Sequence, residues 1–225
     1  MYINDLPDVF HDAVALKLFA DDVKLYSKLA TLSLTTPISI EEYLNKLVKW
    51  SNDWQLPISY SKCCVINLGT RNLPMSSCLM NAKSIPHVDK VIDLGVTMDR
   101  NLKFSDHVSK ICCKSNSRAN LILKCFYSKD TSSLLSAYKT YVRPIVECNS
   151  VVWNPFLIKD INTLEAVQRH FTKRIPEMKH LTYYQRLSKL KLESLELRRL
   201  RTDLLFAYKL VFGMLHMNVA DFFYN

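Results

Sequence analysis

The sequence contains very little glycine: Gly69, Gly95 and Gly213 are the only three glycines in 225 residues. Phosphate-cradling loops and long flexible linkers both need several glycines close together, so neither is expected. Lys209 interrupts the most apolar late stretch, residues 204–215, and a membrane span needs about 20 apolar residues. The N-terminus also lacks the basic segment and unbroken apolar core of a signal peptide. We therefore expect an intracellular protein, nuclear or cytoplasmic, that is not secreted and has no membrane partner.

Metal-binding cysteine motifs are absent as well. The chain has seven cysteines but no Cys-x-x-Cys, so the four-ligand zinc pattern is missing. We expect the thiols to be small buried apolar groups in a reducing compartment, with zinc as a remote alternative. Ser105-Asp106-His107 cannot form a catalytic triad because consecutive residues do not produce that geometry. Ser105 is instead expected to be a helix N-cap.

Positive charge is concentrated in the second part of the chain. Residues 1–100 contain ten Lys and Arg against eleven Asp and Glu, a net of −1, whereas residues 101–225 contain twenty against ten, a net of +10. Basic side chains bind nucleic-acid phosphates without sequence preference and release counterions. The alternative is that these cations form only a solvated helical face.

Asp21 and Asp22 are adjacent carboxylates in the middle of a hairpin pattern. Apolar residues alternate on both sides of them, at Val14, Leu16, Leu18, Val23 and Leu25, which is the period of a β-strand. Two carboxylates side by side repel each other unless a cation lies between them, and Mg²⁺ prefers such oxygen ligands. The alternative is that Asp-Asp is simply a favourable turn sequence.

The remaining pattern of residues 1–100 predicts a small α+β unit. Ser39 and Glu42 form a capping box, and a helix with one apolar stripe follows, through Ile40, Tyr43, Leu47, Trp50 and Trp54. Residues 58–68 are predicted to be a strand, and residues 82–97 a hairpin interrupted near Pro86. A sheet covered by a helix results.

From Ser105 onward the pattern is helical. Helices are predicted over residues 105–127, over 130–141 before Pro144, around Leu164, Val167, Phe171 and Ile175, and over 193–215. The last helix has a stripe that we expect to be core, formed by Leu197, Leu200, Leu204, Tyr208, Val211 and Leu215. Arg198, Arg199 and Arg201 fall largely outside this stripe and could face phosphate.

The chain resembles the reverse transcriptases of non-long-terminal-repeat retrotransposons of the Jockey type. The resemblance begins with Tyr2-Ile3-Asn4-Asp5-Leu6-Pro7 and Leu18-Phe19-Ala20-Asp21-Asp22, which look like the metal-binding palm motif. It continues with Trp50, Trp54, Lys62-Cys63, Leu94-Gly95-Val96, Asp99, Phe104, Ser105 and His107. Further on come Tyr141-Val142-Arg143-Pro144, Glu147, Val152-Trp153-Asn154-Pro155, Leu164-Glu165, Val167-Gln168-Arg169, Tyr184, Arg186 and Leu195-Glu196-Leu197-Arg198-Arg199 with Asp203.

The resemblance implies the end of a polymerase palm over residues 1–100 and a helical thumb-like region over 101–225. It implies that Asp21 and Asp22 bind Mg²⁺ and that Lys62 lies near the triphosphate, where an ammonium stabilises developing charge. The alternative for Lys62 is a solvated lysine at a strand edge. The implied partners are an RNA template and an RNA–DNA hybrid. The residues expected on their backbone are Lys114, Arg118, Lys124, Arg169, Lys173, Arg198, Arg199 and Arg201.

Some family features are missing or altered. The family's other metal-binding Asp and its fingers belong upstream of Tyr2, and its endonuclease region is absent, so we expect a fragment that is inactive alone. Ser59 replaces the usual Asn, Ile92-Asp93 replaces a basic-aromatic pair, and Cys148 replaces Tyr.

Three functions remain open at this point. The chain is part of an RNA-directed DNA polymerase, or a nucleic-acid-binding helical module whose aspartates do nothing, or a non-functional relic of a transposable element. The sequence leaves the oligomeric state undetermined.

Overall fold

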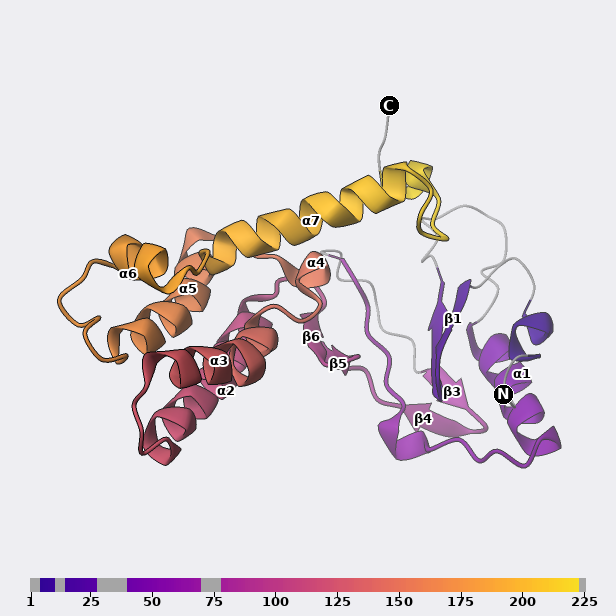
Figure 1. Cartoon of the computed structure of the whole chain (residues 1–225). Helices are drawn as coiled ribbons and strands as arrows, with labels where there is room; N and C mark the ends of the chain where they lie inside the picture. Colours follow the sequence, from indigo (N-terminus) through magenta and orange to yellow (C-terminus); the bar gives the residue numbers. More distant parts are fainter. Residues whose placement is uncertain (1–4, 11–14, 28–39, 70–77, 223–225) are drawn as a thin grey trace. The chain divides into compact units, whose positions relative to one another are not determined.

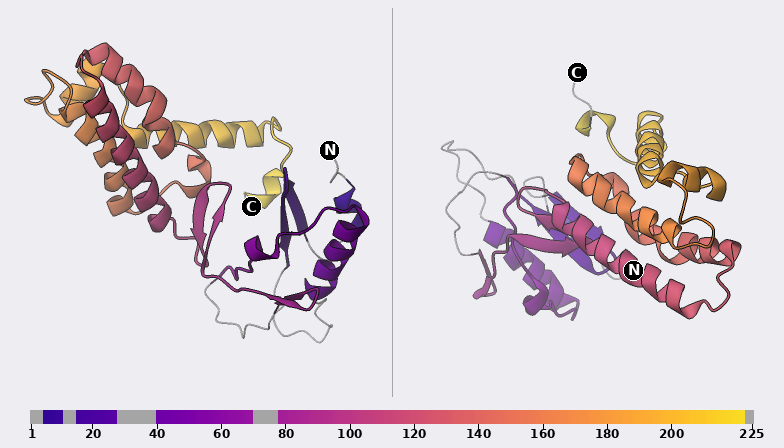
Figure 2. Two further views of the ribbon diagram at one scale, coloured as in Figure 1. Left: turned by 90° about the horizontal axis from the view of Figure 1, so that it is seen from below. Right: turned by 90° about the vertical axis from the view of Figure 1, so that its left-hand side faces the viewer.

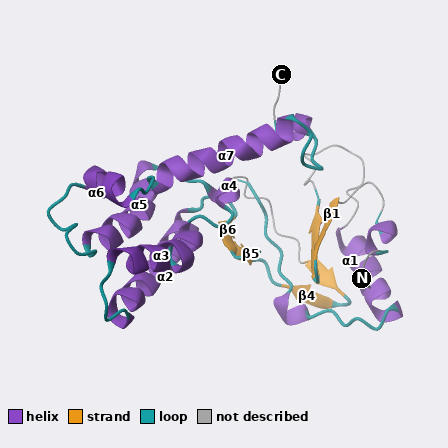
Figure 3. Ribbon diagram, viewed as in Figure 1, coloured by secondary structure: helices purple, strands orange, loops and turns teal. Residues whose placement is uncertain are grey.

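The structure is a computed structural model that describes residues 5–10, 15–27, 40–69 and 78–222 (Figure 1). The chain divides into two compact units, Met1–Lys90 and Val91–Asn225, which are described separately. Helices and small two-stranded sheets both occur, so the predicted α+β class is confirmed (Figure 3). The division falls ten residues before the predicted boundary at residue 100, and the assignment of the units to palm and thumb stays a prediction.

In its described residues, the first unit contains two β-hairpins, one long helix and two short 3-10 helices. Its elements are η1 (Leu6–Val9), β1 (Ala15–Phe19), β2 (Asp22–Tyr26), α1 (Ile40–Asp53), η2 (Tyr60–Lys62), β3 (Cys78–Met80) and β4 (Lys83–Ile85). Two small clusters of apolar side chains hold it together. The unit carries nine basic and nine acidic residues, so its net charge is zero.

Helix α1 covers the first hairpin through the predicted apolar stripe. Leu47 and Trp50 are buried and pack in one cluster with Leu16, Leu18 and Val23. The stripe is therefore confirmed as far as Trp50. Trp54 lies beyond the helix and is 49% exposed, so its predicted place in the stripe was wrong. The predicted capping box lies partly outside the described residues, because Ser39 is not among them.

The predicted strand over residues 58–68 was wrong. Its start is the 3-10 turn η2, in which the Cys63 N–H bonds the Tyr60 carbonyl at 3.2 Å. Only an isolated bridge between Val65 and His87 gives this segment a strand-like partner among the described residues. A strand needs a neighbour along its length, and the apolar pattern alone does not supply one.

The predicted hairpin over residues 82–97 is replaced by two separate hairpins. Strand β4 pairs with the preceding strand β3 in antiparallel orientation, with Cys78 opposite Ile85 and Met80 opposite Lys83. The second hairpin pairs β5 (Lys90–Asp93) with β6 (Val96–Asp99) and, apart from Lys90 at its start, belongs to the other unit. The interruption expected near Pro86 is where the chain passes from one hairpin to the other.

The second unit is a helical assembly that follows the β5–β6 hairpin (Figure 2). Its elements are α2 (Ser105–Cys125), α3 (Thr131–Tyr141), η3 (Arg143–Val146), α4 (Ser150–Trp153), α5 (Ile158–Lys173), α6 (Tyr183–Leu190), α7 (Leu195–Val211) and η4 (Val219–Asp221). A single apolar core joins β6 to α2, α3, α4, α5, α6 and the start of α7. The predicted helices are thus present: α2 starts and α3 ends where predicted, and their other ends and both ends of α7 differ by a few residues.

A buried chain of hydrogen bonds passes through the centre of this core. Gln168 on α5 is 0% exposed; its Oε1 accepts the Tyr138 hydroxyl at 2.9 Å, and its Nε2 donates to the Glu193 carbonyl at 2.9 Å and to the Tyr183 hydroxyl at 3.0 Å. The Tyr183 hydroxyl donates in turn to Glu165. Burial raises the pKa of both tyrosines, so their hydroxyls stay protonated donors.

Glu165 also holds the start of α7. Its two carboxylate oxygens accept the backbone N–H groups of Leu195 and Glu196, each at 3.2 Å. The first N–H groups of a helix have no partner inside the helix and carry partial positive charge, so a carboxylate there is favourable. The buried carboxylate of Glu165 on α5 therefore caps the start of α7 and holds the two helices together.

His107 ties the β5–β6 hairpin to the helices. Its Nδ1 accepts the Thr97 N–H at 3.2 Å, and its ring packs edge-on against Trp153 at 5.2 Å between ring centroids. The side chain is 4% exposed, and burial lowers its pKa, with a smaller contribution from Lys110. Two segments of the resemblance, around His107 and around Trp153, thus meet in one contact.

Two further expectations, on Ser105 and on the cysteines, were wrong. Ser105 is the first residue of α2 rather than its N-cap, and its hydroxyl bonds Asp160 at 2.5 Å. The prediction that a helix ends before Pro144 is confirmed, because α3 ends at Tyr141 and Pro144 lies in the separate 3-10 turn η3. The cysteines are not uniformly buried, since Cys64, Cys113, Cys125 and Cys148 are exposed.

The apolar stripe of α7 is not core. Leu197, Leu200, Leu204, Tyr208 and Val211 are between 40% and 62% exposed. The face of α7 that packs is instead the one containing Leu195, Arg199 and Leu210. Periodicity predicts that a helix has an apolar face but not which of two faces its neighbours cover. No described helix is both long and apolar enough to cross a membrane.

Gln168→Leu should lower the free energy of unfolding by about 2–4 kcal/mol, because it leaves the buried hydroxyl of Tyr138 and the Glu193 carbonyl without partners. Urea unfolding followed by circular dichroism measures this change. Asn162→Ala, which removes an exposed amide from the same helix, is the matched control. Equal effects of the two substitutions would show that the hydrogen-bond chain is not stabilising.

The free energy of unfolding should decrease as the pH falls through about 6.5, the ordinary pKa of histidine. The folded state keeps His107 neutral because its pKa is lowered, so only the unfolded state gains a proton there, and protonation favours unfolding. Urea unfolding between about pH 5 and 7.5 should therefore show a steeper pH dependence than His107→Gln shows. Equal slopes in both proteins would contradict a buried neutral His107.

Candidate functional site

The two aspartates lie at the tip of the β1–β2 hairpin, as predicted. The strands are antiparallel and pair Phe19 with Asp22, so Ala20 and Asp21 form a two-residue turn. Ala20 has φ of +52°, a left-handed conformation, and it alone of the two turn residues has positive φ. A positive φ in a two-residue hairpin turn is usually adopted by glycine, asparagine or aspartate. An alanine there costs roughly 1–2 kcal/mol.

The hairpin separates its apolar and charged side chains. Leu16, Leu18 and Val23 point into the unit's core, so the alternation places Asp22 on the opposite face together with Lys17 and Phe19. Asp21 and Asp22 are both exposed. Their carboxylates are thus open to solvent and to a cation or substrate approaching the tip.

Two carboxylates are suitable ligands for Mg²⁺ but supply only part of a coordination shell. Among the described residues, no group of three or more His, Cys, Asp or Glu side chains converges in a way that could hold a metal. A cation at this tip would therefore need its other ligands from water, from substrate phosphates or from a carboxylate outside the described residues.

Lys62 lies on η2, not at the edge of a strand. Its neighbours Tyr60 and Cys63 pack in the same apolar cluster as Leu25 of the hairpin, whereas Lys62 itself is exposed. No hydrogen bond or ion pair within the described part of the chain joins Lys62 to Asp21 or Asp22. The role of Lys62 near a triphosphate stays a prediction.

Basic residues form a row along one face of α2. Lys110, Lys114, Arg118 and Lys124 recur at intervals that keep them within a sector of the helix less than half a turn wide. Lys114, Arg118 and Lys124 are exposed, and Lys114 and Arg118 line a shallow groove with Ser117 and Leu121. Three predicted nucleic-acid contacts thus share one surface, which we call the α2 basic face (Lys110, Lys114, Arg118 and Lys124).

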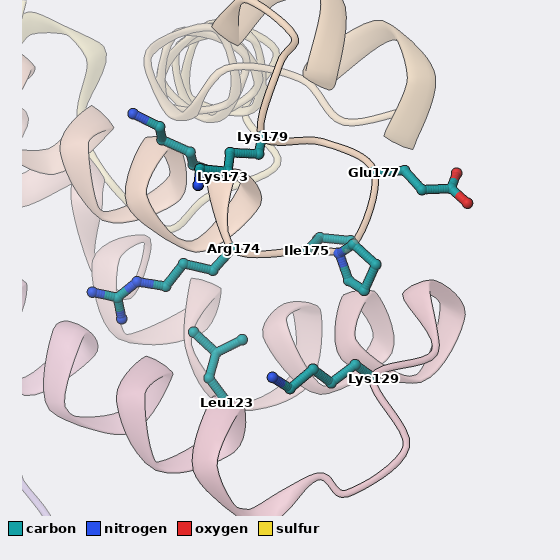
Figure 4. A pocket seen from close by; sticks show the side chains of 8 residues that line it. Leu123, Lys129, Lys173, Arg174, Ile175, Glu177 and Lys179 are labelled. Atoms are coloured by element: carbon teal, nitrogen blue, oxygen red, sulfur yellow. The ribbon is translucent and has the colours of Figure 1, made fainter.

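Four cations surround a surface pocket at the end of α5. The pocket has a volume of about 640 Å³ and is lined by Leu123, Lys129, Lys173, Arg174, Ile175, Pro176, Glu177 and Lys179. In Figure 4, Lys129 approaches from the segment before α3, and the other three cations come from the end of α5 and the loop after it. Glu177 points away from them and pairs with Lys189 at 3.7 Å.

The pocket adjoins the α2 basic face. Arg174 donates a hydrogen bond to Asn120 on α2, and Leu123, which lines the pocket, precedes Lys124. Of the pocket cations only Lys173 was predicted from the sequence. Lys129, Arg174 and Lys179 were missed, although the basic pair Lys173-Arg174 beside Pro176 was a visible signal.

The arginines of α7 are engaged within the protein. Glu147 accepts from Arg198 at 2.5 Å, a hydrogen bond that raises the pKa of Arg198, and Arg201 pairs with Glu193. Arg199 is 2% exposed and its Nε donates to the Asn154 side chain at 3.1 Å, while Asn154 also donates to Asp203. Arg199 therefore supports the helix packing and is not among the residues we propose to contact phosphate.

Arg169 is exposed and stacks over the Tyr183 ring, with 5.1 Å between its guanidinium carbon and the ring centroid. The structure thus brings Lys114, Arg118, Lys124 and Lys173 onto neighbouring surfaces of α2 and α5. Asp21, Asp22 and Lys62 belong to the other unit.

Comparison with known proteins identifies similar polymerases. The chain is 22% identical over 184 residues to an RNA-directed DNA polymerase from mobile element jockey of Drosophila melanogaster, covering 78% of this chain and 20% of that protein. The corresponding protein of Drosophila funebris is 21% identical over 175 residues, covering 76% and 19%. The resemblance to retrotransposon reverse transcriptases is confirmed.

A third relative, the uncharacterized protein B0403.1 of Caenorhabditis elegans, is 24% identical over 131 residues, covering 57% of this chain and 66% of that protein. The chain spans about a fifth of the length of the two jockey polymerases. No protein-family model and no solved structure matches it.

Proposed function

We propose that this chain is part of a retrotransposon RNA-directed DNA polymerase. In this proposal the helical unit, Val91–Asn225, binds the phosphate backbone of an RNA–DNA hybrid. The observation that carries this proposal is the α2 basic face with the adjoining cationic pocket. All the net charge of the chain lies on this unit, which has twenty-one basic and twelve acidic residues, whereas the other unit is neutral.

The dimensions of the α2 basic face suit a nucleic-acid strand. Fourteen residues separate Lys110 from Lys124, which corresponds to about 21 Å along a helix. One strand of a duplex carries a phosphate for roughly every 3.4 Å of its axis, so about six phosphates fit that length. Contacts of this kind bind phosphate groups and do not depend on base sequence.

The acidic hairpin supplies the catalytic part of the proposal. Asp21 and Asp22 would hold Mg²⁺, which, when bound, neutralises charge on the triphosphate. Lys62 would lie near the leaving phosphates. Because two carboxylates alone hold the cation poorly, we propose further that the 225 residues by themselves do not polymerise.

A second function, nucleic-acid binding without catalysis, is supported by the charge distribution. The unit that carries the aspartates has no net charge, so binding would depend on the helical unit alone. Binding and nucleotide incorporation therefore need separate experiments.

Lys114→Ala/Arg118→Ala should weaken binding to an RNA–DNA hybrid and reduce the slope of log K against log salt concentration by about 2, since each phosphate contact contributes about 0.9. Fluorescence anisotropy over a series of salt concentrations measures both quantities. Lys46→Ala/Lys49→Ala on α1 removes the same charge from the neutral unit and should leave the slope unchanged. An unchanged slope in the α2 variant would remove this face from the interface.

The purified chain should incorporate no nucleotide in primer extension on an RNA template with Mg²⁺ or Mn²⁺. If a polypeptide that supplies the remaining polymerase segments restores synthesis, Asp21→Asn should abolish it, because a carboxylate ligand is lost. Synthesis by the chain alone that is sensitive to Asp21→Asn would contradict the proposed inactivity. Restored synthesis that is insensitive to this substitution would contradict the metal-binding role.

A further inference from the structure

Helix α7 carries apolar side chains on two opposite faces. At 100° per residue, the buried residues Leu195 and Leu210 lie on one side together with the half-buried Phe206. The other side carries an exposed set, which we call the outer stripe: Leu197, Leu200, Leu204, Leu205, Tyr208, Val211 and Phe212. A helix that is apolar on opposite sides is normally covered on both.

The outer stripe is large for an exposed surface. Its seven residues are between 40% and 63% exposed, so together they present several hundred Å² of largely apolar surface. The largest apolar patch on a typical monomer is about 300–600 Å², and a stable interface buries about 800 Å² on each partner. The outer stripe therefore matches the largest apolar patch of a typical monomer, which is often an interaction site, and would form the apolar centre of an interface rather than all of it.

The spacing of the outer stripe is that of a coiled-coil seam. Leu197, Leu204 and Val211 repeat every seven residues, and Leu200 and Ala207 lie three residues after the first two of them. These are the a and d positions of a heptad pattern, with Leu205 and Phe212 widening the seam on one side. The packed side of α7 lies opposite, so the helix's own unit does not obstruct the seam.

We propose that the outer stripe pairs with the same helix of a second copy of this chain, in parallel orientation. The flanks of the seam select this partner. One flank carries Arg201, which pairs with Glu193 of its own chain but stays more than half exposed, and the other carries the exposed Glu196. Asp203, beyond Glu196, is held by Asn154 of its own unit. In a parallel two-fold pair the basic flank of each copy faces the acidic flank of the other, and Glu196 lies opposite Arg201 of the partner subunit.

An antiparallel two-fold pair would bring like flanks together. Arg201 would then approach the basic flank of the other copy, and like charges across a helix interface are unfavourable. The seam supplies the affinity and the flanks supply the orientation, because exposed ion pairs contribute little on their own. Binding through α7 leaves the α2 basic face out of the interface.

Sedimentation equilibrium of the nucleic-acid-free chain tests the proposal. A dimer, with twice the 26.1 kDa mass of one chain, is expected. Leu204→Glu should raise the dissociation constant at least about tenfold, since it places a charge in the seam. Leu204→Lys should weaken the dimer to a similar extent. Equal effects of a negative and a positive charge would show that burial of a charge in the seam, and not its sign, is responsible. Both residues are good helix formers, so α7 is retained.

Ile158→Glu is the matched control, because Ile158 is 76% exposed on α5 and lies outside the seam. This variant should remain dimeric. A wild-type chain that is monomeric at every concentration overturns the proposal; in that case another segment of a longer polypeptide would cover the stripe. A dimer that survives both Leu204 substitutions overturns it as well, since its interface would lie elsewhere.

A charge exchange tests the orientation. Glu196→Arg alone should weaken the dimer, because it places two positive charges opposite each other. Glu196→Arg/Arg201→Glu should restore it, because in a parallel pair position 196 of one copy faces position 201 of the other and their charges are again opposite. Failure of the double variant to recover would overturn the parallel orientation. Thermal melts of each variant distinguish loss of pairing from loss of folding. None of these measurements involves nucleic acid, so their outcome is independent of the proposed polymerase role.

Discussion

The helical unit depends on the buried hydrogen bonds of Gln168 and Glu165. Gln168 satisfies the hydroxyls of Tyr138 and Tyr183 and a carbonyl of the segment before α7, and Glu165 accepts the first N–H groups of α7. Each of these groups would cost free energy if it were buried without a partner. Because α3, α5, α6 and α7 all contribute, their relative positions follow from a single set of polar contacts inside an apolar core.

The surfaces that we connect with function follow from this arrangement. Helix α5 packs against α2, so its end places Lys173 and Arg174 beside Lys129 and next to the α2 basic face. Glu165 directs the start of α7, and the ion pairs of Arg198 and Arg201 hold its first turns. The two charged regions are therefore used differently: cations on α2 and α5 remain open to solvent, whereas those of α7 largely hold the unit together.

The sequence predicted the parts of the fold that depend on local pattern. The hairpin around Asp21 and Asp22, helix α1 and the helices of the second unit all follow from period-two or helical spacing together with turn and cap residues. The strand over residues 58–68 failed because strand formation depends on a partner elsewhere in the chain. Ser105 was predicted to be the N-cap of a helix but is the first residue of α2. Its hydroxyl donates a hydrogen bond to the distant carboxylate of Asp160, a contact that local sequence does not reveal.

By itself, the sequence determined the α+β class, the acidic turn, the positions of the helices and the concentration of positive charge after residue 100. Only the tertiary structure decided which polar residues are internal supports, which cations share a surface and which side of α7 is covered. Arg199 illustrates the reason: neighbouring arginines in a helix have the same local chemistry. Whether each meets solvent, a carboxylate or Asn154 depends on helices that lie far away in the sequence.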